Sequence, residues 1–208
     1  MQSFEHSAET FRSNAFGTFV VAKFAADVGA KLVYSGSTAI FGNDMADQHL
    51  NPYAWTKAKN VELLQNMRAW FGLRYAICYF YNVFGPLQIT TGPYATVIGI
   101  FERQRAAGEA LTVVSPGTQT RAFTHVDDIV EGVIRVGDSG DGDGYLLGTT
   151  ENLSILDVAE MFGGPFTFVS PRRGERQSSK ILPSRARTEL GWRPNRCLEE
   201  YVASLKLE

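Results

Sequence analysis

The sequence lacks the features that mark several large classes of protein. Its two cysteines, Cys78 and Cys197, are isolated from each other, form no metal-ligand pair and are typical of a reducing compartment. No apolar run approaches the ~18 residues of a membrane span, and the N-terminus has no secretory signal pattern. We therefore expect a cytoplasmic protein that has no membrane partner.

An excess of charge of either sign is also missing. The formal net charge is -2, and the sequence contains no basic block and no acidic tail. Such blocks are typical of proteins that bind nucleic acids or charged partners, so we expect no nucleic-acid partner. The remaining composition, 44% hydrophobic and 20% charged, can supply one large core or two small ones.

Apolar residues follow a helical period in some stretches and form short buried runs in others. The helical period predicts helices at residues 7–28, 52–72, 94–107, 126–136, 155–161 and 183–190. The short runs predict strands at residues 31–35, 74–81, 111–114, 121–124, 145–147 and 166–169. Alternating helices and buried strands are typical of an α/β fold with a parallel sheet.

A tyrosine and a lysine lie four residues apart near the start of one predicted helix. Asn51 and Pro52 suit the cap and the first position of that helix, so Tyr53 and Lys57 share one face. Free tyrosine titrates near pH ~10, and a fixed neighbouring cation favours the phenolate. The pair could therefore form a base, although the same spacing also fits a packed ring beside a solvated lysine.

Two segments lie at the carboxyl ends of predicted strands. Residues 35–38 come after one strand, and residues 82–86 come after the next strand along the chain. Ligands of parallel α/β sheets bind beyond the carboxyl ends of the strands. Both segments are therefore expected to converge on the helix that carries Tyr53.

Seven short stretches, taken in order, resemble the extended short-chain dehydrogenases/reductases, in particular the NAD-dependent sugar-nucleotide epimerase/dehydratase family. The stretches are residues 14–18, 33–42, 53–57, 81–86, 120–128, 172–175 and 189–192. The resemblance implies a partial Rossmann-type parallel sheet flanked by helices, with a small C-terminal α/β substrate-binding part. It divides the chain into a dinucleotide-binding domain (residues 1–88 and 120–148) and a substrate-binding domain (residues 89–119 and 149–208).

The resemblance also implies catalytic roles. Tyr53 is expected to act as the acid/base toward a sugar hydroxyl, and Lys57 to stabilise the phenolate and hold the nicotinamide ribose. Ser37 is expected to hydrogen-bond the reacting oxygen, with Thr38 as the alternative. The implied cofactor is NAD, and its expected contacts are Tyr53, Lys57, Ser35, Phe80 and Asn14.

The other end of the implied substrate is a nucleoside diphosphate. The residues expected to bind the substrate are Ser37, Thr38, Asn82, Arg121, Arg172 and Ser179. Arg121 and Arg172 resemble the family's diphosphate clamps, since guanidinium groups bind phosphate oxygens in a bidentate fork; Arg173 could replace Arg172. The small Ser179 matches a position that limits the size of the sugar's C2 substituent, which leads to the hypothesis that UDP-N-acetyl sugars fit.

The residues after Ser37 discriminate among the reactions of the family. Dehydratases place an Asp-Glu pair there, and the related decarboxylases also use the glutamate. The matching residues here are Thr38 and Ala39, which cannot carry a proton at neutral pH. The sequence therefore favours a 4-epimerase acting through a keto-sugar, with a reductase or 6-epimerase as less favoured alternatives.

One element of the family pattern is absent from the sequence, because it contains no Gly-x-x-Gly-x-x-Gly loop to bind the cofactor pyrophosphate. The resemblance begins just before the family's fourth parallel strand, so we expect the first strands to be missing and the strand at 31–35 to have an apolar edge. The chain could be a fragment of a longer enzyme. A non-catalytic remnant that binds nucleotide sugars or forms dimers therefore remains the alternative.

Two further expectations concern surfaces and metals. The first long helix and the Tyr53 helix form a dimer seam in the family, which implies a homodimer; the same apolar residues could instead belong to the core of one chain. These residues are Phe11, Phe19, Leu63, Met67 and Trp70. We expect no metal site, because His125, Asp127 and Asp128 better fit a helix N-terminus.

Overall fold

The structure is a computed structural model that describes residues 2–41, 51–171, 177–178 and 181–205. A three-stranded parallel sheet runs through its centre in the order β1-β2-β7, formed by β1 (Lys31–Ser37), β2 (Arg74–Phe80) and β7 (Gly142–Leu147). Among the described strands β1 pairs with β2 alone, so it lies at the expected sheet edge. The predicted α/β class with a parallel sheet is confirmed.

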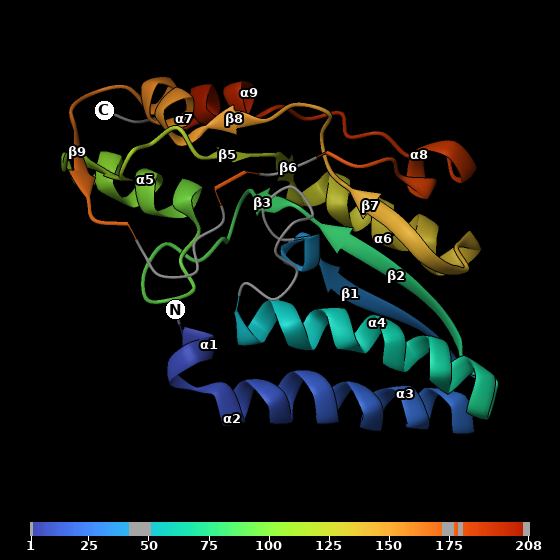
Figure 1. The fold of residues 1–208 in the computed structure, drawn as a ribbon. Helices are drawn as coiled ribbons and strands as arrows, with labels where there is room; N and C mark the ends of the chain where they lie inside the picture. Colours follow the sequence, from blue (N-terminus) through green and yellow to red (C-terminus); the bar gives the residue numbers. More distant parts are fainter. Residues whose placement is uncertain (1, 42–50, 172–176, 179–180, 206–208) are drawn as a thin grey trace.

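Helices cover both faces of this sheet (Figure 1). On one face lie α3 (Gly17–Asp27) and α4 (Pro52–Phe71), and on the other lies α6 (Val126–Ser139). The limits of α4 follow from its sequence. The side chain of Asn51 accepts a hydrogen bond from Ala54 N at 2.9 Å, and Gly72 ends the helix with a φ of 68°.

The N-terminal helical region is less regular than its sequence predicted. The expected helix at residues 7–28 is divided into segments, and the central one has the wider turn of a π-helix. The segments are α2 (Ser7–Thr10), η1 (Phe11–Phe16) and α3, and a further short helix, α1 (Gln2–Glu5), precedes them. Within η1, Asn14 O accepts a hydrogen bond from Asn60 Nδ2 of α4 at 2.8 Å, a side-chain contact of the kind that accompanies a local widening of a helix.

Short strand pairs extend the fold beyond the central sheet. β3 (Asn82–Phe84) pairs in parallel with β6 (Phe123–His125), β4 (Leu111–Val114) in parallel with β9 (Phe166–Val169), and β5 (Thr120–Arg121) antiparallel with β8 (Leu153–Ser154). The single strand expected at residues 121–124 is wrong, because the chain changes partner at Ala122. The break expected at residues 82–86 is also wrong at its start, where Asn82 N donates to Ala122 O and β3 begins.

The remaining described helices are short. They are η2 (Thr38–Phe41), α5 (Val97–Ala106), α7 (Ile155–Phe162), α8 (Arg185–Glu189) and α9 (Leu198–Ser204). α5 begins at Val97 and not at residue 94 as expected, because Thr96 is its N-cap and accepts from Gly99 N. α9 was not predicted; its two buried residues, Leu198 and Val202, give too short an apolar pattern to indicate a helix.

Apolar side chains gather in clusters on the two sides of the molecule. One group joins α3, α4 and α6 to the central sheet, and another joins β3, β4, β6, α5, α7 and α9. Trp192 is 1% exposed and packs as expected, whereas Trp70 is 62% exposed. Met67 lies in the core of its own chain. The division into two domains stays a prediction.

Candidate functional site

The carboxyl end of β1 and the first turns of α4 bring the predicted catalytic residues together. Lys57 Nζ donates to Ser35 O at 2.9 Å, which ties α4 to the strand. The same nitrogen lies 5.9 Å from the centroid of the Tyr53 ring and 4.9 Å from that of the Tyr34 ring. Tyr53 is 37% exposed, so its phenol can be reached from outside the chain. The four-residue spacing thus places a cation between the strand end and the tyrosine.

The electrostatic state of Lys57 is altered by its surroundings. Burial against β1 and the two tyrosine rings lowers the pKa of Lys57, because desolvation disfavours the ammonium form. The carbonyl oxygen of Ser35 and the faces of the two rings all favour that cation. The Lys57 ammonium is consequently held in a fixed position beside β1.

The hydroxyl groups of Ser37 and Thr38 lie just beyond the same strand end. Ser37 Oγ accepts from Ala39 N at 3.2 Å, a contact that caps the turn after β1. This bond uses Ser37 as an acceptor, so its hydroxyl hydrogen is available for a substrate oxygen. Thr38 Oγ1 donates to Phe80 O at 3.1 Å and joins the ends of β1 and β2.

Behind the catalytic face, a buried asparagine connects three elements. Asn60 is 1% exposed, and its Nδ2 lies 2.8 Å from Asn14 O, 3.1 Å from Thr18 Oγ1 and 2.8 Å from Tyr34 OH. Asn14 Nδ2 in turn donates to Thr56 Oγ1 at 3.2 Å. Sequence reasoning missed Asn60, although a polar residue one turn after Lys57 in a helix interior signals a specific partner.

A cavity of about 520 Å³ lies beside the end of β2. Asn82 and Arg121 both line it, as their predicted role in substrate binding requires, and Asn82 follows Phe80, the register partner of Ser37, by two positions. Arg121 Nη1 donates to Thr120 O at 2.8 Å. The walls are mostly apolar, and sequence reasoning missed them: Val97, Ile98, Ile100, Phe101, Val114, Phe123, Ile155 and Val169.

One buried polar atom of this cavity wall has no partner among the described residues. Gln119 donates through Nε2 to Val114 O at 2.9 Å, and this contact fixes the orientation of its amide. Its Oε1 is then directed away from that carbonyl and accepts no hydrogen bond. The described part of the cavity therefore combines apolar walls with a few polar groups, as small-molecule sites usually do.

Not every predicted residue can be placed. Arg172, Arg173 and Ser179 lie outside the described residues, so their substrate roles stay predictions. Phe80 ends β2, and its side chain packs toward the cluster under α6. His125 caps α6, accepting from Asp127 N at 3.2 Å, as the helix N-terminus interpretation predicted.

The described residues fit one end of a dinucleotide. Tyr53, Lys57 and Ser35 offer a phenol, an ammonium and a strand-end carbonyl within one helical turn, groups suited to a ribose and its attached ring. The sequence has no Gly-x-x-Gly-x-x-Gly loop for the pyrophosphate. Within the described ranges no group of three or more His, Cys, Asp or Glu residues could hold a metal ion, and no helix is long and apolar enough to cross a membrane.

Comparison with known proteins agrees with this fold. The sequence pattern of the NAD dependent epimerase/dehydratase family matches residues 1–148, and the chain belongs to that family.

Individual relatives share about a quarter to a third of their residues with the chain. It is 30% identical to a UDP-glucose 4-epimerase of Mycolicibacterium smegmatis (strain ATCC 700084 / mc(2)155), over 91% of the chain and 66% of the relative. It is 28% identical to UDP-glucuronic acid decarboxylase 1 of Xenopus tropicalis, over 92% of the chain and 50% of the relative. The chain thus spans between half and about two thirds of the length of these relatives.

A solved structure supports the fold assignment. The UDP-glucose 4-epimerase of Thermotoga maritima, solved with UDP-glucose, superimposes with a TM-score of 0.89 at 23% identity, covering 98% of this chain and 71% of the other. At this identity the likeness establishes the Rossmann-type fold and leaves the particular reaction to be argued from the residues.

Proposed function

We propose that the chain carries the proton-transfer and substrate-binding groups of an NAD-dependent nucleotide-sugar 4-epimerase, acting on a UDP-hexose or UDP-N-acetylhexosamine. The observation that carries the proposal is the placement of Lys57 between Ser35 O and the Tyr53 ring, on the strand β1 that pairs with β2, beside whose end the 520 Å³ cavity lies. The membership of the chain in the family supports it.

In the proposed reaction, Tyr53 as a phenolate removes the proton of the sugar's C4 hydroxyl. Ser37 donates a hydrogen bond to the same oxygen, and the Lys57 ammonium stabilises the phenolate before the transfer. Bound NAD would supply the hydride acceptor, and later the hydride donor, for C4. Between these steps the keto-sugar turns over, and Tyr53 then gives the proton back to the C4 oxygen, which completes the inversion.

The side chains after Ser37 favour epimerisation over the other reactions of the family. Ala39 ends in a methyl group, and the Thr38 hydroxyl donates to Phe80 O. Neither can serve as the proton carrier that the elimination of water requires. The resemblance assigns a glutamate to the decarboxylases at the position of Ala39. The lack of this glutamate argues against decarboxylation, although the chain is similar to a decarboxylase.

The cavity fits the other end of the substrate. Its apolar walls can enclose a flat base, while Asn82 and Arg121 can bind the diphosphate that links base and sugar. This places the sugar toward the end of β2, beside Ser37. The proposed substrate domain comprises residues 89–119 and 149–208.

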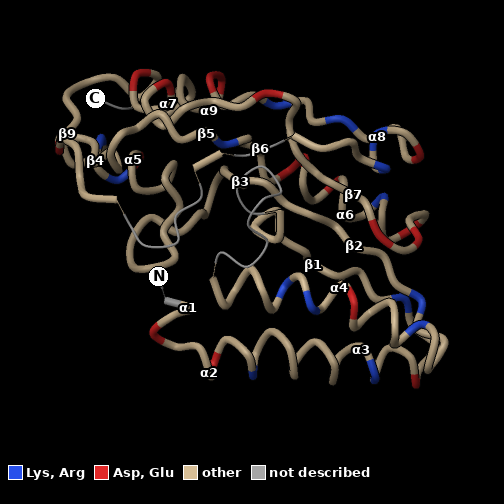
Figure 2. Tube along the Cα trace, viewed as in Figure 1, with Lys and Arg blue, Asp and Glu red and all other residues tan. Residues whose placement is uncertain are grey.

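A homodimer through α3 and α4 is part of the proposal. Apolar side chains of these helices are exposed, among them Phe24, which is 66% exposed, and Trp70. Figure 2 shows no charged residue on the N-terminal helices between Arg12 and Lys23. Large exposed apolar side chains on two helices that pack side by side support an interface with a second copy of the chain.

The direct test is the interconversion of UDP-glucose and UDP-galactose by the purified chain with added NAD, together with measurement of NAD that remains bound after purification. We expect conversion, and we expect the same with UDP-N-acetylglucosamine if Ser179 leaves room for the acetyl group. Rejection of the acetylated sugar alone would contradict only the size hypothesis.

A second candidate is a non-catalytic protein that binds nucleotide sugars. The observation that favours it is the absence of the glycine loop from a sequence that still contains the cavity. It predicts UDP binding by calorimetry with neither turnover nor NAD binding. That result would refute the epimerase proposal.

A further inference from the structure

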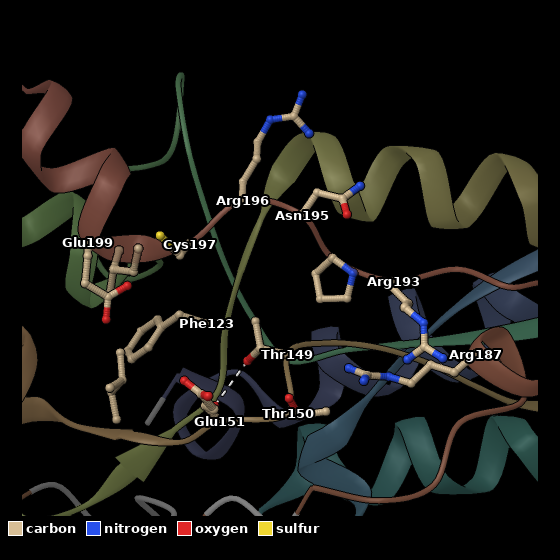
Figure 3. Close-up of a pocket in the computed structure, with 13 residues that line it drawn as sticks. Phe123, Thr149, Thr150, Glu151, Arg187, Arg193, Asn195, Arg196, Cys197 and Glu199 are labelled. Carbon is tan, nitrogen blue, oxygen red and sulfur yellow. Dashed lines mark hydrogen bonds between the residues drawn. The ribbon is translucent and has the colours of Figure 1, made fainter.

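A second cavity, of about 380 Å³, lies outside the proposed substrate site (Figure 3). It is formed by the segment after β7, by the segment that joins α8 to α9, and by the start of α9. Phe123 lines both cavities, but the arginines of this one, Arg187, Arg193 and Arg196, do not line the other. No role in the proposed epimerase reaction uses them.

Among the residues that the structure describes, two of these three arginines have no carboxylate partner. Arg196 is neutralised, because its Nη1 lies 2.9 Å from Asp128 Oδ1 and its Nη2 lies 3.5 Å from Asp127 Oδ2. Arg187 donates to a neutral acceptor, Gly148 O, at 2.6 Å. No described residue accepts a hydrogen bond from Arg193.

The two unneutralised guanidinium groups are neighbours. Figure 3 shows them together at one end of the cavity, on the same side as Thr150. Arg187 is half-buried, and its pKa is lowered first by desolvation and then by the positive charge of Arg193. Two like charges held together, one of them partly desolvated, are unfavourable unless an anion lies between them.

The geometry points to a phosphate group as that anion. We propose that Arg187 and Arg193 bind a phosphate, either free or at the end of a small phosphomonoester, with the Thr150 hydroxyl as a further donor. Guanidinium groups suit phosphate because their N–H groups match pairs of its oxygens. Glu151 and Glu199 line the same cavity and can accept hydrogen bonds from hydroxyl groups on the body of a phosphomonoester.

Few of the described groups nearby can compete with an anion for the two arginines. Glu189, the carboxylate two residues after Arg187 in the sequence, is held by Arg185 through contacts of 2.6 and 2.9 Å. Gly148 cannot be replaced by a bulkier residue, because a Cβ there would meet the Tyr81 ring at 2.2 Å. The carbonyl that orients Arg187 is thereby kept in place.

The test measures binding of inorganic phosphate to the purified chain by calorimetry, with chloride used to hold the ionic strength constant. In R193Q the affinity should fall about tenfold, equivalent to ~1.4 kcal/mol. R193Q removes an exposed side chain, so it is expected to fold. R103Q removes the same charge from a surface pair with Glu109 and should bind phosphate as the unmodified chain does.

R121Q separates this site from the proposed diphosphate site. Phosphate affinity that survives in R121Q and falls in R193Q supports the inference, and it does so whether or not the chain is an epimerase. Affinity that is unchanged in R193Q, or that is lost in R121Q alone, overturns it. Glycerol 3-phosphate serves as the second probe: tighter binding than inorganic phosphate supports a phosphomonoester ligand, and equal binding supports the free ion.

Discussion

The proposed proton-transfer end of the site and the cavity at the end of β2 are built in different ways. At the proton-transfer end, hydrogen bonds hold each group: Lys57 to Ser35 O, Ser37 to Ala39 N, and Asn60 to three partners behind them. This end lies on β1, at the edge of the described sheet. The cavity is enclosed by apolar side chains from helices and strands far apart in the sequence.

Because the two parts are built differently, they can contribute differently to catalysis and to binding. Hydrogen bonds to backbone atoms fix direction, which proton transfer needs. Apolar walls bury the apolar surface of a ligand, which gives affinity but does little to fix the orientation of the ligand. If this comparison is correct, substitutions at the first part should change the rate and leave binding intact, while substitutions at the second should do the reverse.

The largest effect is expected for Y53F. Phenylalanine keeps the ring beside Lys57 but cannot accept or return a proton, so kcat should fall by about 10²–10⁴-fold. UDP affinity should stay the same, because Tyr53 does not line the cavity. Steady-state kinetics with NAD and calorimetry with UDP provide the two measurements.

Y75F is the matched control for this prediction. Tyr75 lies at the beginning of β2, its ring faces Arg68 at 4.3 Å, and it is remote from the strand end that carries Ser37. Its kcat should be unchanged. A Y53F protein as active as Y75F would remove the catalytic interpretation.

The next effect in size is expected for R121Q. Loss of a charged donor to the diphosphate should weaken UDP binding and raise KM by about 10–100-fold, the equivalent of ~1.5–3 kcal/mol. The value of kcat should change little. R103Q removes the same charge elsewhere, and equal KM values for the two variants would argue against a phosphate contact at Arg121.

The residues behind these two predictions differ in how well the sequence alone predicts their position. The Tyr53–Lys57 pair and the residues around Ser37 could be predicted, because a helix start and a strand end place them through local geometry. The apolar wall of the cavity could not, since Ile98, Phe123 and Val169 come from α5, β6 and β9, which meet only in the folded chain. α9 and the π-helical turn at Asn14 were missed for a similar reason, as both depend on distant partners.

A smaller, pH-dependent effect is expected at Lys57. Burial lowers its pKa below the ~10.4 of a solvated lysine, so the ammonium is lost at a lower pH than usual. Activity that depends on this charge should fall as pH rises through the lowered pKa. Over the same window, between the lowered value and ~10.4, the unfolded chain binds more protons, so this group's contribution to stability should rise with pH.

Measurement of kcat and of urea unfolding midpoints between pH 7 and pH 10 would check that activity falls with pH while this contribution to stability rises. In K57R the guanidinium stays charged over this range, so the alkaline loss of activity should disappear even where kcat is reduced. An alkaline limb that is unchanged in K57R would assign the titration to another group. The cavity has no corresponding lysine, and UDP affinity should show no such limb.

The smallest effect is expected for the ion pair that joins the end of α4 to the turn before β7. Arg68 Nη2 lies 2.7 Å from Asp141 Oδ1, but the two side chains are 38% and 71% exposed, so D141N should reduce the free energy of unfolding by at most ~1 kcal/mol. The Arg68 guanidinium holds the pKa of Asp141 below its ordinary ~3.9, so the contribution is present above that value and is lost as pH falls through the lowered pKa. Urea unfolding at pH 7 should therefore distinguish D141N from the unmodified chain, and the difference should shrink in acid. A change in kcat or in UDP affinity at pH 7 would show that this edge of the sheet is coupled to the site, contrary to the separation of the two parts.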